Sequence, residues 1–93
     1  MPMFEGAFRL YVAGRAGKSR RVEETVRRIL DEGPAGSFRL EVIDVSAFPK
    51  RAEADGVSAV PTLAPPRSMS GRRIVGDFSQ EEQLRALINS WAE

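Results

Sequence analysis

The chain has 93 residues, of which 42% are hydrophobic and 29% charged, and its formal net charge is +1. This composition predicts one small globular domain over residues 1–93, and the balanced charge gives no reason to expect a nucleic-acid partner. No apolar run approaches the roughly 20 residues that span a bilayer, and the first residues lack a signal-peptide pattern. We therefore expect a cytoplasmic protein with no membrane partner.

Cysteine and histidine are both absent from the chain. Without cysteine there can be no disulfide, thiolate nucleophile or zinc–thiolate site, and without histidine the commonest general base and metal ligand is missing. An enzyme would have to work with carboxylates, Lys, Arg, Tyr or Ser. We therefore predict that the protein is not an enzyme and has no catalytic residue, metal site or cofactor.

The first predicted element is a strand over residues 8–12. Its side chains alternate between two faces, with Phe8, Leu10 and Val12 on one and Arg9 and Tyr11 on the other. Such alternation is typical of a strand, and Gly14 ends it. A helix should follow, with Ser19 as its N-cap and Gly33-Pro34 at its end. Its helical spacing is carried by Val22, Val26, Ile29 and Leu30.

In the middle of the chain, apolar segments are separated by residues that end helices and strands. Residues 38–45, FRLEVIDV, are dense in β-branched and apolar side chains, which predicts a second strand covered on both faces. Pro49 suits the first turn of a short helix that ends at Gly56. Residues 57–63 should then form a third strand, which contains a proline, and residues 72–75 a short fourth strand.

The last predicted element is a helix over residues 79–92, in which Ser79 and Glu82 have the spacing of a capping box. Its apolar stripe consists of Leu84, Leu87, Ile88 and Trp91. The resulting order, βαβαββα, predicts a thioredoxin-like α/β fold with a mixed four-stranded sheet and helices on both faces. In a sheet ordered 2-1-3-4, the strand over residues 38–44 is an outer edge.

Residues 17–19, Gly-Lys-Ser, are those that end a phosphate-binding loop of the pattern G-x-x-x-x-G-K-[ST]. That pattern places its first glycine at position 12, where this chain has Val12, and Gly14 is too close to serve. We therefore reject nucleotide binding and interpret the stretch as a glycine turn before a helix.

Residues 56–63, GVSAVPTL, resemble a segment of the thioredoxin superfamily in which the proline is cis. The resemblance implies a cis peptide bond before Pro61. Thioredoxins place Cys-x-x-Cys in the loop that corresponds to residues 15–19, where this chain has Arg-Ala-Gly-Lys-Ser. We therefore expect the scaffold without its thiol chemistry, which leaves ligand binding without redox catalysis.

Four segments together resemble the KaiB family of circadian-clock proteins. They are LYVAG at 10–14, VIDV at 42–45, VPTL at 60–63 and RRIVGDFS at 72–79. The resemblance implies a non-enzymatic timing protein that binds the N-terminal ATPase ring of KaiC. It also implies control over which other proteins dock there, such as KaiA or a histidine kinase with a KaiB-like sensor domain.

The resemblance further implies that an alternative fold is open to the chain. Better-known family members rest as a βαββααβ tetramer and bind KaiC as a thioredoxin-like monomer. Switching members carry Gly and Asp where this chain has Leu87 and Asn89. An interior Gly costs a helix about 1 kcal/mol, and burying a Leu contributes about 1.5–3 kcal/mol. Because metamorphic states differ by only a few kcal/mol, we predict a thioredoxin-like resting state, monomeric or weakly dimeric rather than tetrameric.

Two regions are candidates for binding a partner. A cluster of positive charge near a helix N-terminus is unfavourable with the helix dipole, so the basic residues at 15–21 form either a solvated face or a contact for an acidic partner. The predicted edge strand could accept an added strand. Tyr11, on the neighbouring strand, is either packed beneath a helix or exposed. The candidate residues are Tyr11, Arg15, Lys18, Arg20, Arg21, Arg39 and Glu41.

Two other functions stay open. One is a glutathione-binding enzyme module that uses the Val60-Pro61 backbone, with Tyr11 or Ser19 activating the thiol and the Asp77-Phe78-Ser79 segment nearby. The other is the sensor domain of a histidine kinase, detached from its kinase. Asp44 and Asp77 both follow predicted strands, and we expect turn or cap roles for them.

Overall fold

The computed structural model describes residues 7–33, 39–66, 72–76 and 78–91. Within these ranges the predicted βαβαββα order is confirmed. The elements are β1 (Ala7–Val12), α1 (Lys18–Glu32), β2 (Arg39–Asp44), α2 (Pro49–Ala54), β3 (Thr62–Ala64), β4 (Ile74–Val75) and α3 (Glu81–Trp91).

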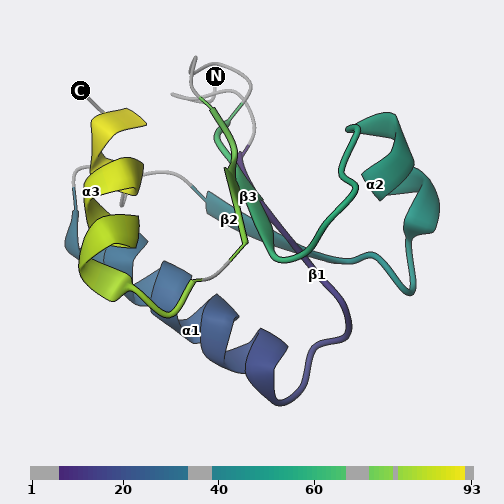
Figure 1. Cartoon of the computed structure of the whole chain (residues 1–93), viewed down its shortest axis with the longest axis horizontal. Coiled ribbons are helices and arrows are strands. Elements are labelled where there is room, and N and C mark those ends of the chain that lie inside the picture. The colour runs from purple at the N-terminus through teal and green to yellow at the C-terminus, as the bar shows by residue number, and fades with distance from the viewer. Residues whose placement is uncertain (1–6, 34–38, 67–71, 77, 92–93) are drawn as a thin grey trace.

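The four strands form one mixed sheet in the order β2-β1-β3-β4. β1 pairs with β2 in parallel, while β3 is antiparallel to both β1 and β4. The parallel pair requires a crossover, which α1 supplies. In Figure 1, α1 and α3 lie on one side of the sheet and α2 on the other. The predicted thioredoxin-like sheet with helices on both faces is therefore confirmed.

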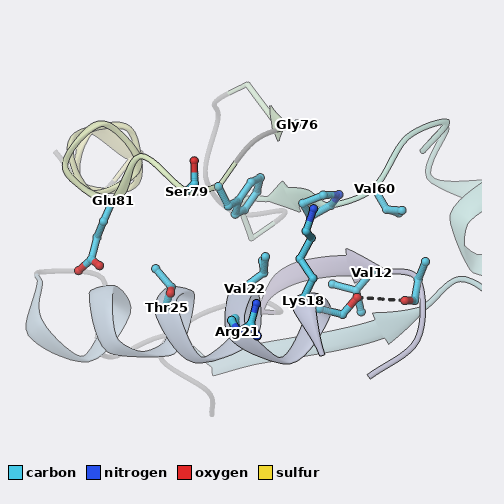
Figure 2. Close-up of a pocket in the computed structure, with 13 residues that line it drawn as sticks. Val12, Lys18, Arg21, Val22, Thr25, Val60, Gly76, Ser79 and Glu81 are labelled. Carbon is cyan, nitrogen blue, oxygen red and sulfur yellow. Dashed lines mark hydrogen bonds between the residues drawn. The ribbon is translucent and has the colours of Figure 1, made fainter. Parts of the chain in front are cut away.

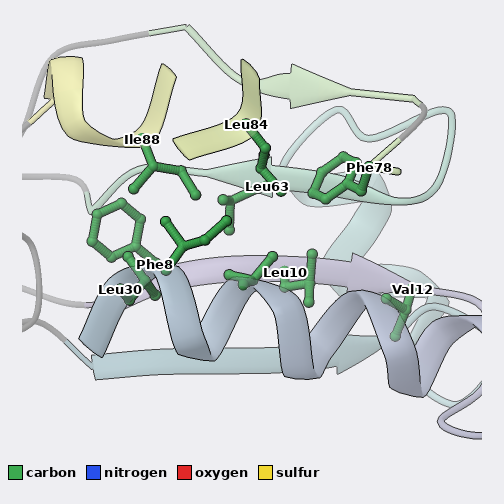
Figure 3. Close-up of a cluster of buried hydrophobic side chains, with 10 residues drawn as sticks. Phe8, Leu10, Val12, Leu30, Leu63, Phe78, Leu84 and Ile88 are labelled. Atoms are coloured by element: carbon green, nitrogen blue, oxygen red, sulfur yellow. The ribbon is translucent and has the colours of Figure 1, made fainter. Parts of the chain in front are cut away.

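The larger apolar core lies between the sheet and the helices α1 and α3 (Figure 3). Trp91, at the end of α3, packs against this core, and its ring centroid is 5.6 Å from that of Phe8. The buried side chains are Phe8, Leu10, Val12, Val26, Ile29, Leu30, Leu63, Phe78, Leu84 and Ile88. Each Å² of apolar surface that these side chains remove from water stabilises the fold by about 25 cal/mol, and this burial holds both helices on the sheet.

The opposite face of the sheet, under α2, is held differently. Its apolar cluster has three buried members, Tyr11, Ile43 and Ala52. Beside it, Asp55 Oδ2 accepts hydrogen bonds from the Tyr11 hydroxyl and, at 3.1 Å, from Arg9 Nε. Arg9 also donates to the carbonyl of Pro65 at 3.3 Å. A buried polar network thus joins β1 to the chain after α2 and after β3.

The predicted N-cap of the first helix is wrong. α1 begins at Lys18 after Gly17, which has no capping side chain, and the Ser19 hydroxyl instead donates to the carbonyl of Ala13 at 3.0 Å. α3 begins at Glu81, and the capping box of Ser79 and Glu82 stays a prediction. At the other end of α1, Gly33 is the C-cap as predicted.

β2 is not covered on both faces as its apolar density suggested. Arg39 and Glu41 are exposed, and Ile43 is its one buried residue. These three side chains share the α2 face, where a helix of only six residues reaches Ile43 but not the start of the strand. β2 is therefore a partly open edge, as its outer place in the predicted strand order required.

The third strand is shorter than predicted, because only Thr62–Ala64 pairs in the sheet. The peptide bond between Val60 and Pro61 is cis, as expected from the sequence, and proline cannot donate to a ladder. The fourth strand is likewise reduced to Ile74–Val75. Before β3, Val57 and Val60 pack against the apolar cluster under α2, and Pro61 lies in a cleft wall beside the start of α1.

The expected burial of Leu87 is also wrong, because its side chain is 44% exposed. Leu84 and Ile88, on the same helix, are buried, so the apolar stripe is narrower than its spacing suggested. Asn89 faces the end of α1, and a Cβ placed on Gly33 would lie 2.6 Å from its Oδ1 atom. Glycine at position 33 therefore permits the close approach of α1 and α3.

Candidate functional site

The predicted basic cluster lies at the start of α1, with all four side chains exposed. Arg15 is ion-paired with Glu23 at 3.1 Å and Arg20 with Glu24 at 3.2 Å. The side chains of Lys18 and Arg21 make no hydrogen bond or ion pair with any described residue, although the backbone N–H of Arg21 donates to the carbonyl of Gly17. The cluster therefore carries two neutralised and two free cations, which the spacing alone could not distinguish. The four members are Arg15, Lys18, Arg20 and Arg21.

Asp44 fixes the loop that leads into this cluster. Its Oδ1 atom accepts hydrogen bonds from the backbone N–H groups of Gly14 and Ser46, each at 2.9 Å. These bonds, that from Gly14 first, lower the pKa of the Asp44 carboxyl below its usual range. The turn role predicted for Asp44 is confirmed, whereas Asp77 lies outside the described residues.

The two edge-strand candidates lie elsewhere on the sheet. Glu41 accepts two hydrogen bonds from Arg51 on α2, at 2.6 and 3.1 Å, and these lower the pKa of its carboxyl. Arg39 is in register with Ala7, at the opposite end of β1 from the basic cluster. At about 3.3 Å per residue, roughly 16 Å of strand separates the two regions. The structure thus divides the candidates into two sites.

Tyr11 belongs to neither region. Its side chain is 1% exposed and packs beneath α2, so it offers no surface to a partner in this conformation. Burial raises the pKa of the Tyr11 hydroxyl above its usual range, and the hydrogen bond to Asp55 acts in the same direction. Of the two positions left open for this residue, packing beneath a helix is correct.

A cleft of about 780 Å³ opens between the start of α1, the cis-proline segment and the residues before α3 (Figure 2). In this view Lys18 extends from the first turn of α1 toward the segment that holds Val60, and Glu81 points from α3 toward α1. The lining residues are Val12, Ala13, Lys18, Ser19, Arg21, Val22, Thr25, Val60, Pro61, Gly76, Phe78, Ser79 and Glu81. A thioredoxin-like scaffold thus keeps a concave site beside its cis-proline.

The geometry removes one of the two residues proposed to activate a glutathione thiol. Tyr11 lies on the far face of the sheet from the cleft. Ser19 lines the cleft, but its hydroxyl proton is directed to the carbonyl of Ala13. In the described part of the chain, no group of three or more His, Asp or Glu side chains could hold a metal ion.

The network around Asp55 was missed by the sequence reasoning. Arg9 is 9% exposed, although a charged residue in an alternating strand usually faces solvent. The available signal was that Arg9 and Tyr11 share one strand face, so both had to lie beneath whatever covers it. Arg73 adds a further hydrogen bond, to the backbone carbonyl of Asp55.

Among the described helices, none has the length and hydropathy needed to cross a bilayer.

Residues 9–91 match the family model of the KaiB domain. The chain belongs to the KaiB family. It is 45% identical over 76 residues to the circadian clock oscillator protein KaiB of Prochlorococcus marinus strain MIT 9313, a match that covers 82% of this chain and 64% of that protein. The KaiB of Synechococcus elongatus strain PCC 7942 is 42% identical over 76 residues, which cover 82% of this chain and 74% of that protein.

Two solved structures share the fold of this KaiB-family chain. A mutant thioredoxin from Halobacterium salinarum superposes with a TM-score of 0.74 at 25% identity, over 97% of this chain and 77% of that one. The N-terminal domain of SasA from Synechococcus elongatus superposes with a TM-score of 0.71 at 22% identity, over 98% and 86%. The thioredoxin-like fold predicted from the sequence is thereby confirmed in a chain without cysteine.

Proposed function

We propose that the protein is a non-enzymatic KaiB-like adaptor that binds a KaiC-type ATPase ring and controls which other proteins dock there. The observation that carries the proposal is a thioredoxin-like chain of the KaiB family whose α3 is helical over Glu81–Trp91. The family resemblance links that form, rather than the tetrameric one, to ring binding. The system served is a circadian clock or a related timing or signalling system.

The proposed contact with the ring is the basic cluster at the start of α1. Its exposed cations would steer an acidic surface into place, and steering of this kind acts on association rates and on specificity. Among the described residues, Lys18 and Arg21 have no carboxylate partner that a ring surface would have to displace. We assign the ring contact to Arg15, Lys18, Arg20 and Arg21.

The second partner would use the open edge of the sheet. Arg39 and Glu41 mark the exposed part of β2, where backbone groups are available for strand addition. Because this edge lies at the other end of β1 from the basic cluster, two proteins could be bound without overlap. A histidine kinase with a KaiB-like sensor domain is one such protein, and the likeness of this fold to the SasA domain supports that choice.

The test is a charge reversal measured against a KaiC-type ring. The double variant Arg20→Glu/Arg21→Glu should weaken binding about tenfold, or about 1.4 kcal/mol, with the fold unchanged. Binding by the parent chain should also weaken with added salt, since exposed charges are screened over about 8 Å at physiological ionic strength. Lys50→Glu/Arg72→Glu is the control, because it reverses two exposed cations elsewhere on the molecule.

Equal binding by the parent and the Arg20/Arg21 variant at low salt would show that the basic cluster is only a solvated face. For the non-enzymatic part of the proposal, we expect no insulin reduction and no phosphate release by the isolated chain. Activity in either assay, from protein free of contaminating enzymes, would contradict it.

A further inference from the structure

The cleft beside Pro61 shares two residues, Lys18 and Arg21, with the proposed ring contact, but the adaptor function makes no use of its apolar wall. Its volume of about 780 Å³ lies within the range of roughly 300–1,000 Å³ that small-molecule sites occupy. Much of its wall is apolar and comes from four separate segments of the chain. These apolar residues are Val12, Ala13, Val22, Val60, Pro61 and Phe78.

The cleft also carries positive charge that no described residue neutralises. Lys18 and Arg21 both line it, and neither side chain has a hydrogen-bond or ion-pair partner in the described ranges. Their neighbours Arg15 and Arg20 do not line it, and each is paired with a glutamate of α1. The free cations of this region are therefore those that face the cleft.

One carboxylate lines the described part of the cleft, and it is already neutralised. Glu81 is ion-paired with Arg28 at 2.6 Å and with Arg85 at 2.8 Å. At the mouth, α1 has no acidic residue in its first turn and no side-chain cap, so its first amide groups add to the positive field. Among the described lining residues, the electrostatic balance favours an anion.

We propose that this cleft binds a small apolar organic acid. The carboxylate lies between Lys18 and Arg21, and the apolar body extends along Val22 toward Phe78, within the space drawn in Figure 2. The apolar wall gives affinity through burial, and the two cations give selectivity for acids over neutral molecules of the same shape. The site needs no partner protein, so it can be tested separately from ring binding.

Decanoate is the probe, titrated into the full chain labelled with ¹⁵N while the amide resonances are followed. We expect saturable shifts confined to residues 12–25, 60–63 and 76–81, with a dissociation constant of about 1 mM or tighter. Decanamide, which has the same chain and no charge, should bind roughly tenfold more weakly. Absence of saturation, shifts centred elsewhere, or equal binding of the two probes would overturn the proposal.

A pair of variants separates the site from general charge attraction. Lys18→Gln/Arg21→Gln should weaken decanoate binding roughly tenfold, whereas Lys50→Gln/Arg72→Gln removes the same two residue types outside the cleft and should change it less than about twofold. If both double variants weaken decanoate binding equally, the proposed site is wrong. If the first variant fails to fold, the decanoate and decanamide comparison on the parent chain decides.

Two further probes limit the chemical class. Inorganic phosphate should bind more weakly than decanoate, since it has no apolar body, and equal affinity would reduce the site to an anion site. Reduced glutathione should also bind more weakly. Tighter binding of glutathione than of decanoate would assign the cleft to a glutathione-binding module and overturn the proposal.

Discussion

The two faces of the sheet are held by different forces. Between the sheet and the helices α1 and α3, ten buried apolar side chains form one cluster. Under α2, three of the described residues are buried in such a cluster, and Asp55 joins Arg9 and Tyr11 in a polar network beside it. Apolar packing is non-directional and insensitive to charge, whereas a buried network depends on every member. We therefore expect different substitutions and different pH changes to destabilise the two faces.

Removing Asp55 should have the largest effect. In Asp55→Ala, the nearly buried Arg9 loses its ion-pair partner, and breaking such a pair lowers the free energy of unfolding by about 3–5 kcal/mol. Glu53→Ala, an exposed carboxylate of α2, is the control and should change it by less than about 0.5 kcal/mol. Urea unfolding followed by circular dichroism measures both. A loss under about 1 kcal/mol for Asp55→Ala would mean that α2 is held by its apolar contacts alone.

The apolar face can be tested with two leucines of one helix. Leu84→Ala should lower the free energy of unfolding by about 2–5 kcal/mol, because Leu84 is 3% exposed and its loss leaves a cavity. Leu87→Ala, at a position that is 44% exposed, should lower it by less than about 1 kcal/mol. The same urea experiment compares them. Equal losses would mean that α3 presents a different face to the sheet.

The α2 face should be sensitive to high pH. The pKa of Tyr11 is raised in the folded chain, so the folded state holds its proton where the unfolded state loses it. The resulting stabilisation is complete below the unfolded pKa of about 10 and is lost as pH rises through the folded value. Unfolding measured from neutral pH to about pH 11 should show this loss in the parent and not in Tyr11→Phe. Identical pH profiles would show that ionisation of Tyr11 does not contribute to the loss of stability at high pH.

The smallest effect is expected at low pH, from Asp44. Its pKa is lowered by the hydrogen bonds from Gly14 and Ser46, so its contribution is present above the unfolded pKa of about 3.9 and is lost as pH falls through the folded value. Asp44→Asn should abolish that part of the acid slope in a urea series below about pH 4. An unchanged slope would show that other carboxylates determine acid stability.

Much of the fold could be predicted because it depends on local patterns. The alternation at residues 8–12, Pro49 at a helix start and the proline of VPTL each specify local geometry. The strand order then follows from the thioredoxin-like fold that the order of the elements predicts. Ser19 is not the N-cap because it lies inside the first turn of α1, where its hydroxyl donates to the carbonyl of Ala13 in the loop before the helix. Turn geometry of this kind is not encoded by residue type alone.

The site was predicted less completely because its charges pair over long distances. Arg9 contacts Asp55 across 46 positions of sequence, and Glu41 contacts Arg51 from a different element. No periodicity links such positions. The same limit applies to the basic cluster. The sequence placed its four cations together but could not say which two, Arg15 and Arg20, are paired with glutamates.

The central claim is that the chain is thioredoxin-like before it meets a partner. Backbone chemical shifts of residues 82–90 test it most directly, measured on the full chain alone in solution. We expect helical shifts throughout this range, because α3 is already formed in the free chain and packs Leu84 and Ile88 on the sheet. Strand shifts over the same residues would contradict it.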